Sequence, residues 1–141
     1  MRKRRDADVR VDGLDGNRAI MPFLMRRKNE SAVLFEEVVA LTRTLPWLAA
    51  LGEDAHLFHL LLLAIGRTLH EHPRLNRYIA GRRHYQRAEV TLAFAMKPSL
   101  DARAPLSVLK LTVAPDETFD GLASRVHERV SRGRAGERSE S

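Results

Sequence analysis

Six histidines are the residues of this chain with the clearest potential for chemistry, as general bases or as metal ligands. His70 and His72 flank Glu71, but alternate positions on a helix point about 200° apart, so the two imidazoles do not meet at one ion. His56 and His59 are three residues apart and can converge on one side of a helix. Because neither a cysteine nor a clear third carboxylate ligand accompanies them, we predict no metal site.

His84 and His127 are the remaining candidates for a catalytic base. Neither has a nucleophile or an orienting acid at a diagnostic spacing, and an isolated histidine is usually structural or exposed. The chain also contains no Gly-x-Ser-x-Gly motif and no phosphate-binding loop. The histidines therefore predict no catalytic residue.

A basic and aromatic run between residues 82 and 87 is the best internal candidate for contact with an anion. Arg82, Arg83 and Arg87 surround Tyr85, a pattern that suits phosphates or nucleic acid. The alternative is a solvated hairpin in which Tyr85 packs inward. The net charge of +6 adds little, because much of the excess lies near the two ends of the chain, which we interpret as solvated tails. Nucleic acid is therefore not the partner we expect.

The composition is that of a globular protein. Its 141 residues suit one domain, and 44% apolar with 30% charged residues is typical of folded chains. The longest apolar run, Leu57 to Ile65, is too short to span a membrane. The basic start from Met1 to Asp6 has no apolar stretch behind it, so it does not resemble a secretory signal, and we expect a cytoplasmic location.

Hydrophobic periodicity and turn residues divide the chain into elements. The first part is predicted as a loose basic leader over 1–16, a helix capped by Asn17 and a strand over Ser31–Leu41. A short helix over Thr44–Leu51 and a long helix capped by Asp54 and ended by Pro73 follow, and then a hairpin over 78–87 that turns at Gly81-Arg82. The last part is predicted as strands over Val90–Met96 and Leu106–Val113, a helix from Asp116 or Thr118 to about 131, and a polar tail over 132–141. Strands unevenly interspersed with helices favour an α+β fold with a mixed sheet packed by helices.

The order of these features, over residues 17–131, resembles the acyltransferase catalytic domain of 2-oxoacid dehydrogenase complexes, which has a chloramphenicol acetyltransferase-like fold. The features that carry the resemblance are Asn17–Met25, Val33–Leu51, the element His72-Pro73-Arg74-Leu75-Asn76, and the strand pair Val90–Met96 and Ala104–Val113. The resemblance implies acyl transfer between a coenzyme A or lipoyl thiol and an acceptor. It also makes coenzyme A phosphates a possible ligand of Arg82, Arg83 and Arg87.

In that family, a histidine in a His-x-x-x-Asp-Gly motif takes the proton from the thiol, because a free thiol is largely protonated at neutral pH. The residues four positions before the three Asp-Gly pairs of this chain are Asp8, Val11 and Asp116. The motif is therefore absent, and the chain corresponds to the amino-terminal half of the domain, with no catalytic residue of its own. Arg18 matches the family arginine that pairs with the aspartate of the motif and so supports the histidine.

These expectations leave several states of the protein open. Members of the family form trimers with active sites between subunits, so we expect a homo-oligomer, a trimer by resemblance, or a complementary chain that supplies the second half. A natural half-protein, a split enzyme and a truncated gene product are all compatible with the sequence. The alternative function is a non-catalytic binding or assembly module with a basic surface for an anionic partner.

Overall fold

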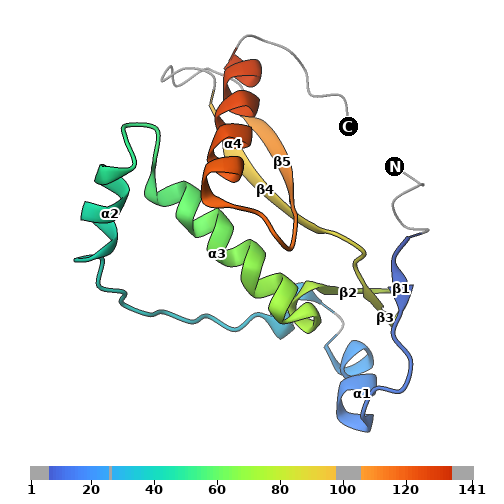
Figure 1. Cartoon of the computed structure of the whole chain (residues 1–141). Coiled ribbons are helices and arrows are strands. Elements are labelled where there is room, and N and C mark those ends of the chain that lie inside the picture. The colour runs from blue at the N-terminus through green and yellow to red at the C-terminus, as the bar shows by residue number, and fades with distance from the viewer. Residues whose placement is uncertain (1–6, 26, 98–105, 135–141) are drawn as a thin grey trace. The chain divides into compact units, whose positions relative to one another are not determined.

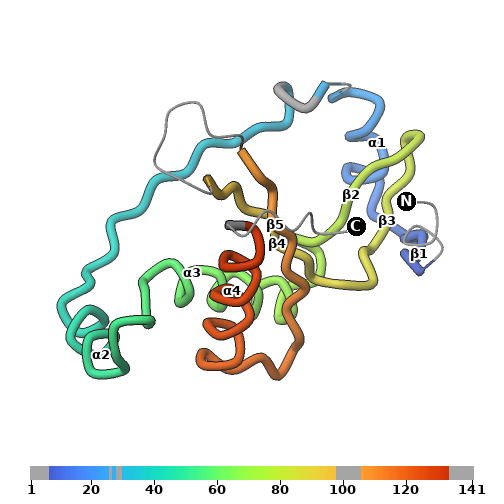
Figure 2. The backbone as a smooth tube through the Cα atoms, turned by 90° about the horizontal axis from the view of Figure 1, so that it is seen from above, coloured from blue at the N-terminus to red at the C-terminus, as the bar shows by residue number. Residues whose placement is uncertain are grey.

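The computed structural model describes residues 7–25, 27–97 and 106–134, and their contacts divide the chain into two compact units (Figures 1 and 2). The first unit comprises Met1–Ala40 and His72–Ala88, and the second comprises Leu41–Glu71 and Glu89–Ser141. Each unit contains helices as well as strands, which confirms the α+β class. All strand pairs in the described residues are antiparallel, so the predicted mixed sheet is not what they form.

The sheet of the first unit has the strand order β1-β3-β2, with β1 at Val9–Arg10, β2 at Arg77–Ala80 and β3 at Arg83–Gln86. Gly81 and Arg82 join β2 to β3 with φ angles of 55° and 63°. A two-residue turn with positive φ at both positions matches the twist of a hairpin. The predicted hairpin and its turn are therefore confirmed.

The carboxylate of Asp8 anchors strand β1 in addition to the pairing of β1 with β3. Asp8 Oδ2 accepts a hydrogen bond from the Tyr78 hydroxyl at 3.0 Å, and Asp8 Oδ1 accepts one from the Ala88 backbone N–H at 2.9 Å. Tyr78 also stacks on Tyr85 with ring centroids 5.4 Å apart. These contacts join residues about 70 to 80 positions apart in sequence. Because local sequence patterns do not reveal contacts between distant residues, β1 was predicted as part of a loose leader and not as a strand.

Helix α1 (Gly16–Leu24) begins slightly earlier than predicted. Asp15, and not Asn17, is its N-cap residue, and Asp15 Oδ1 accepts from the Arg18 backbone N–H at 3.0 Å. Aspartate in this position satisfies an N–H group that the first turn of a helix leaves free. The short 3₁₀ helix η1 (Lys28–Ser31) follows.

Residues 32–40 form no strand, and the prediction of a strand over Ser31–Leu41 is wrong. The segment has the β-branched and aromatic content of a strand, but in the described residues no neighbouring strand bonds to it. Its apolar side chains are almost fully exposed, with Val33 at 89%, Leu34 at 99% and Phe35 at 85%. β-propensity reflects packing against neighbours on a pleated surface, so without a neighbour the preference does not produce a strand.

The second unit contains α2 (Thr44–Ala50), α3 (Leu57–Glu71), the antiparallel pair β4 (Val90–Met96) and β5 (Ser107–Val113), and α4 (Phe119–Arg134). Helices α3 and α4 pack on each other and on the strand pair (Figure 1). The types of these elements and most of their bounds agree with the prediction, but α3 begins at Leu57, so Asp54 is not its N-cap residue as predicted. The core that they share consists of Leu62, Leu63, Val90, Leu111, Val113, Leu122 and Val126.

Alternate residues of β5 face the helices, as expected for a strand that is covered on one face. Leu109 and Leu111 are 4% and 0% exposed, whereas the intervening Lys110 is exposed. Gly66 allows α3 to approach β5 closely, because a Cβ at this position would lie 2.6 Å from Val113 Cγ1. α3 ends at Glu71, directly before the predicted stop, and the 3₁₀ helix η2 (Pro73–Asn76) follows.

The predicted tails lie partly outside the described residues. This applies to residues 1–6, whose four basic residues and one aspartate give a net charge of +3, and to residues 135–141. The start of the predicted polar tail, Arg132 to Arg134, is the last turn of α4.

Candidate functional site

A cavity of about 560 Å³ opens beside α4 in the second unit. Its volume falls within the range of roughly 300 to 1,000 Å³ that is common for sites of small organic ligands. One side is the segment that follows α2, and the other is α4. The residues that line it are Leu51, Asp54, Ala55, Phe119, Asp120, Ala123, Ser124, His127, Glu128, Ser131 and Arg132.

Helix α4 brings its polar side chains to this cavity through its amphipathic pattern. Leu122 and Val126 are buried in the core, which orients the rest of the helix. Residues three, four and seven positions apart share a helix face, and Asp120, Ser124 and His127 have this spacing. The cavity therefore presents an acid, a hydroxyl and an imidazole along one stripe.

His59 is buried behind the start of α3, with 6% of its surface exposed. Its Nδ1 accepts a hydrogen bond from the His56 backbone N–H at 3.3 Å, which fixes the ring as the acceptor in this contact. Burial lowers the pKa of His59, and the nearby imidazoles of His56 and His127 lower it further, while Asp54 opposes the shift. His59 is therefore a neutral residue that supports the first turn of α3.

His127 is the imidazole that a ligand in this cavity could contact, because its side chain is exposed and lines the cavity. Among the described residues, no hydrogen bond joins it to Ser124 or to another group that would act as a nucleophile. Triad-type catalysis needs such a bond and a third group that orients the base. The cavity can hold a ligand, but its described residues do not form a catalytic pair.

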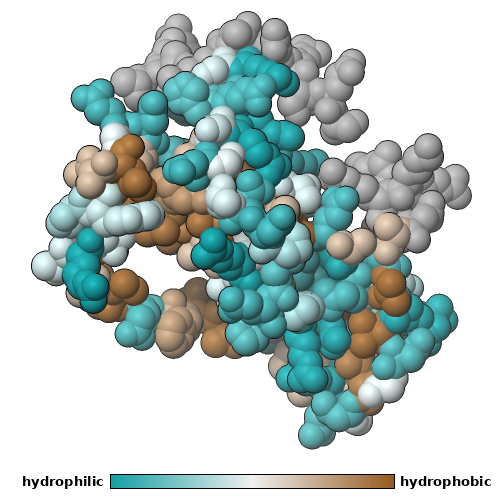
Figure 3. Space-filling view, in the orientation of Figure 1, coloured by the Kyte–Doolittle hydropathy of each residue, from teal (hydrophilic) through white to brown (hydrophobic). Residues whose placement is uncertain are grey.

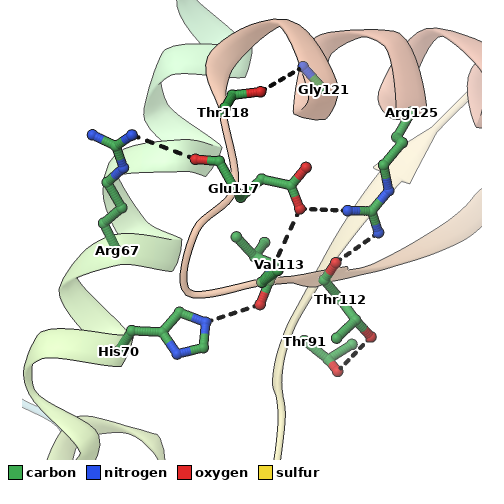
Figure 4. Close-up of polar contacts among 10 residues, drawn as sticks. Arg67, His70, Thr91, Thr112, Val113, Glu117, Thr118, Gly121 and Arg125 are labelled. Atoms are coloured by element: carbon green, nitrogen blue, oxygen red, sulfur yellow. Dashed lines mark hydrogen bonds and ion pairs between the residues drawn. The ribbon is translucent and has the colours of Figure 1, made fainter.

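The start of α4 is fixed by a polar cluster around Glu117 (Figure 4). Its carboxylate pairs with the Arg125 guanidinium and accepts from the Ala114 backbone N–H, and its backbone carbonyl accepts from Arg67 Nη2 at 3.4 Å. Arg125 Nη2 also donates to the Thr112 carbonyl at 2.7 Å. The cluster joins α3, β5 and α4, so its role is to position the helix that carries His127.

Arginines from α4 also cover the backbone of β5. Arg129 Nη1 donates to the Lys110 carbonyl at 2.7 Å, two residues along the strand from the Thr112 carbonyl that Arg125 reaches. His70 was considered and rejected as a metal ligand in the sequence. Its Nε2 forms a hydrogen bond with the Val113 carbonyl at 2.9 Å. In the part of the chain that the structure describes, no group of three or more His, Cys, Asp or Glu residues could bind a metal ion.

The structure places the predicted support residue, Arg18, at the start of α1. Its Nε lies 3.5 Å from Asp15 Oδ2, and both side chains are more than half exposed. Arg18 therefore has a local carboxylate partner from the preceding turn. An exposed pair of this kind contributes about 0 to 1 kcal/mol, so it is easily exchanged for another carboxylate.

The three predicted phosphate-contact residues do not converge on a cavity. The Arg82 guanidinium lies over the Phe23 ring at 5.3 Å, and the Arg87 guanidinium lies over the Tyr78 ring at 4.6 Å. Arg83 is exposed. Tyr85 stacks within the hairpin, as in the alternative interpretation of this run.

The first unit has a smaller cavity, of about 200 Å³, that the sequence analysis did not predict. Three arginines line it, from α1, η2 and β2 respectively: Arg18, Arg74 and Arg77. A signal for it existed in Arg74 and Arg77, which follow Pro73 three residues apart; only Arg74 belongs to the family element, and Arg77 entered no prediction. His84, in β3 of the same unit, has a buried Nε2 with no hydrogen-bond partner in the described residues.

In the ranges that the structure describes, no helix is both long and apolar enough to span a bilayer. Comparison of the chain with models of protein families, with curated proteins and with solved structures found no match.

Proposed function

We propose that this chain is part of an acyltransferase-like domain that transfers an acyl group between a coenzyme A or lipoyl thiol and an acceptor, and that it is active only when another polypeptide completes the domain. The order of sequence elements over residues 17–131 supports the family. The observation that carries the need for completion is the unpaired, apolar segment at residues 32–40. The proposal includes a cytoplasmic location for the protein.

The exposed apolar surface of this segment supports completion of the fold by a partner. Figure 3 shows hydrophobic atoms along the thin arc of chain that Figure 1 draws between η1 and α2. Burial of one large apolar side chain contributes roughly 1.5 to 3 kcal/mol, so five such side chains represent several kcal/mol of stabilisation that a partner would recover. The five side chains are Val33, Leu34, Phe35, Val38 and Val39, which are 70% to 99% exposed.

An added strand is the partner that best suits this segment. Its backbone runs as an open arc (Figure 1) and pairs with no strand in the described residues, so its N–H and C=O groups are available for a ladder. β-branched and aromatic side chains stabilise such pairs through cross-strand contacts. A trimer, or a complementary chain that carries the second half of the domain, would supply the strand.

The lack of a thiol-activating base in the described residues agrees with completion of the domain by a second polypeptide. Thiol activation needs a positioned base, and the histidine side chains that form hydrogen bonds in the described residues bond to backbone groups and not to carboxylates. The exposed Arg18–Asp15 pair can be replaced by the aspartate of a His-x-x-x-Asp-Gly motif at little cost. Arg18 would then act as a positioning residue for the incoming histidine.

The test measures acetyl transfer from acetyl-coenzyme A to dihydrolipoamide. The purified chain is expected to give no turnover alone, and to give turnover when mixed with a polypeptide that carries the second half of an acyltransferase domain with the motif. Phe35→Lys should abolish both complex formation and turnover, because it places a charge in the new strand pair. The control is Leu75→Lys, in η2, where the side chain is also exposed, at 66%.

Two results would contradict the proposal. One is that the chain and the second half form no complex at micromolar concentration. The other is that Phe35→Lys supports as much complex and turnover as Leu75→Lys, since the segment would then have no part in completion.

A second candidate function is a non-catalytic binding or assembly module for an anionic partner. The observation that favours it is the number of exposed arginines in the first unit, including Arg10, Arg82, Arg83 and Arg87. Binding of this kind weakens steeply as salt rises, because phosphate contacts release counterions. Titration of the chain with duplex and single-stranded DNA at two salt concentrations distinguishes it, and affinity that is absent at low salt would exclude it.

A further inference from the structure

The 200 Å³ cavity of the first unit is formed by two stretches of the sequence, residues 11–18 and 74–77. The loop from Val11 to Asp15 forms one side, with Gly13 at a φ of 71° in its bend. Arg18 from α1, Arg74 from η2 and Arg77 from the start of β2 complete the lining. All of these residues belong to the same compact unit.

The Arg77 side chain is oriented before any ligand arrives. Its Nε donates to Gln86 Oε1 at 3.1 Å, and Gln86 Nε2 in turn donates to the Pro73 carbonyl at 2.9 Å. The glutamine is therefore fixed at both ends of its amide. A guanidinium positioned through Nε keeps its two terminal nitrogens available, and an oriented side chain loses less entropy when it binds.

The carboxylates around the cavity are already neutralised. Asp12 pairs with Arg10 Nε at 2.9 Å. Asp15 accepts from the Arg18 backbone N–H and pairs with the Arg18 guanidinium. Among the described residues, neither Arg74 nor the terminal nitrogens of Arg77 contact a carboxylate. The cavity therefore carries about two uncompensated positive charges.

Charge and size together select the ligand. A phosphate monoester or inorganic phosphate carries about −1.5 to −2 charge at pH 7, which matches two uncompensated guanidinium groups, whereas a carboxylate carries only −1. The fork of an arginine also binds phosphate oxygens in a bidentate manner. At about 200 Å³ the cavity is smaller than the roughly 300 Å³ at which sites for whole organic ligands begin, so it suits one small group.

We propose that this cavity is a phosphate-binding site in which Arg74 and Arg77 hold a phosphate dianion, either free or as the monoester end of a larger molecule. The proposal goes beyond acyl transfer and does not depend on it. Arg77 is the oriented member of the pair, and Arg74 is the member without a structural contact in the described residues. Arg18, which is paired with Asp15, lines the cavity and adds no net charge.

The experiment is calorimetric titration of the full chain with inorganic phosphate, with adenosine 3′-monophosphate and with acetate, at low salt and pH 7.5. We expect one phosphate per chain, and affinity for phosphate at least about tenfold above that for acetate. Arg74→Gln and Arg77→Gln should each weaken phosphate binding by about tenfold or more, the size of one charge-assisted contact. Arg43→Gln, which removes the same charge from a residue outside the cavity, is the matched control.

Arg74→Gln keeps the experiment valid if Arg77→Gln fails to fold, because no structural bond of Arg74 is lost. Equal affinity for phosphate and adenosine 3′-monophosphate assigns the site to free phosphate, and tighter binding of the nucleotide assigns it to a monoester. The proposal is overturned if phosphate does not bind. It is also overturned if acetate binds as tightly as phosphate, or if Arg43→Gln weakens binding as much as Arg74→Gln.

Discussion

The buried imidazole of His59 should make the start of α3 sensitive to acid. At neutral pH its Nδ1 accepts the His56 backbone N–H, and protonation of Nδ1 would remove that acceptor and place a charge in a buried position. Burial lowers the pKa of His59 below the ordinary value of 6.5. The unfolded chain therefore binds this proton at a higher pH than the folded chain does.

The sign and size of the effect follow from proton linkage. Between the lowered pKa and 6.5 the unfolded state binds more protons, so the free energy of unfolding falls as the pH falls. The limiting slope for one proton is about 1.4 kcal/mol per pH unit. At pH 5.5 the loss from this proton is at most about 1.4 kcal/mol, which corresponds to at most about 6 to 11 °C in Tm for a unit of this size.

The assay compares urea unfolding of the wild-type chain and of His59→Gln at intervals between pH 8 and pH 5. His59 is the third residue of α3, where glutamine accepts the N-cap N–H in a capping box, so the variant should keep the bond and lose the titration. The wild type should lose stability relative to the variant only below about pH 7. His72→Gln, at an exposed position, controls for the removal of one imidazole.

Parallel stability curves for the wild type and His59→Gln would refute the reasoning, because the proton uptake would then be the same in the folded and unfolded states. A wild type that gains stability relative to the variant as the pH falls would also refute it. That result would mean that protonated His59 has a favourable partner in the fold.

Two further predictions concern packing and polar contacts in the second unit. Gly66→Ala should lower the free energy of unfolding by about 1 to 2 kcal/mol, because its Cβ would lie 2.6 Å from a buried Val113 methyl that has no room to move. Gly133→Ala meets the flexible end of a methionine at the same distance, so the control variant should be neutral or more stable in urea unfolding. Glu117→Gln should lower the free energy of unfolding by about 1 to 3 kcal/mol, since it leaves the Arg125 guanidinium without its carboxylate, and a variant as stable as the wild type would contradict this role.

The elements that the sequence predicts well are those whose determinants are local. The alternating apolar residues of β4, the turn at Gly81-Arg82 and the proline after α3 each act within a few residues. The apolar stripe of α4 likewise predicts which side of that helix faces the core, with Leu122 and Val126 buried.

The elements that the sequence did not predict depend on distant partners. β1 is held through Asp8, whose partners Tyr78 and Ala88 lie in the hairpin and just beyond it. The segment at 32–40 shows the opposite case, because its residues favour a strand and the described residues provide no strand to pair with. Sequence patterns record preference, and pairing is a property of two segments.

The candidate sites follow the same rule. Histidines and arginines are visible in the sequence, but their use depends on what surrounds them. His59 forms a cap because it is buried next to His56, and Arg77 lines a cavity because Gln86 orients it. The basic run at 82–87 had the stronger pattern, and its arginines instead lie over aromatic rings or in solvent.

The arginines that bond to β5 limit where a further strand can pair with the small sheet of the second unit. Thr112 lies opposite Thr91 in the ladder, and their hydroxyl oxygens are 3.3 Å apart. This short distance is typical of a pair without mutual backbone hydrogen bonds, in which the N–H and C=O groups of each residue point away from the other strand. The carbonyls of Lys110 and Thr112 therefore lie on the outer side of β5, where Arg129 and Arg125 already occupy them. A strand that pairs with the outer side of β5 must therefore displace two guanidinium groups, whereas no arginine in the described residues bonds to the backbone of β4.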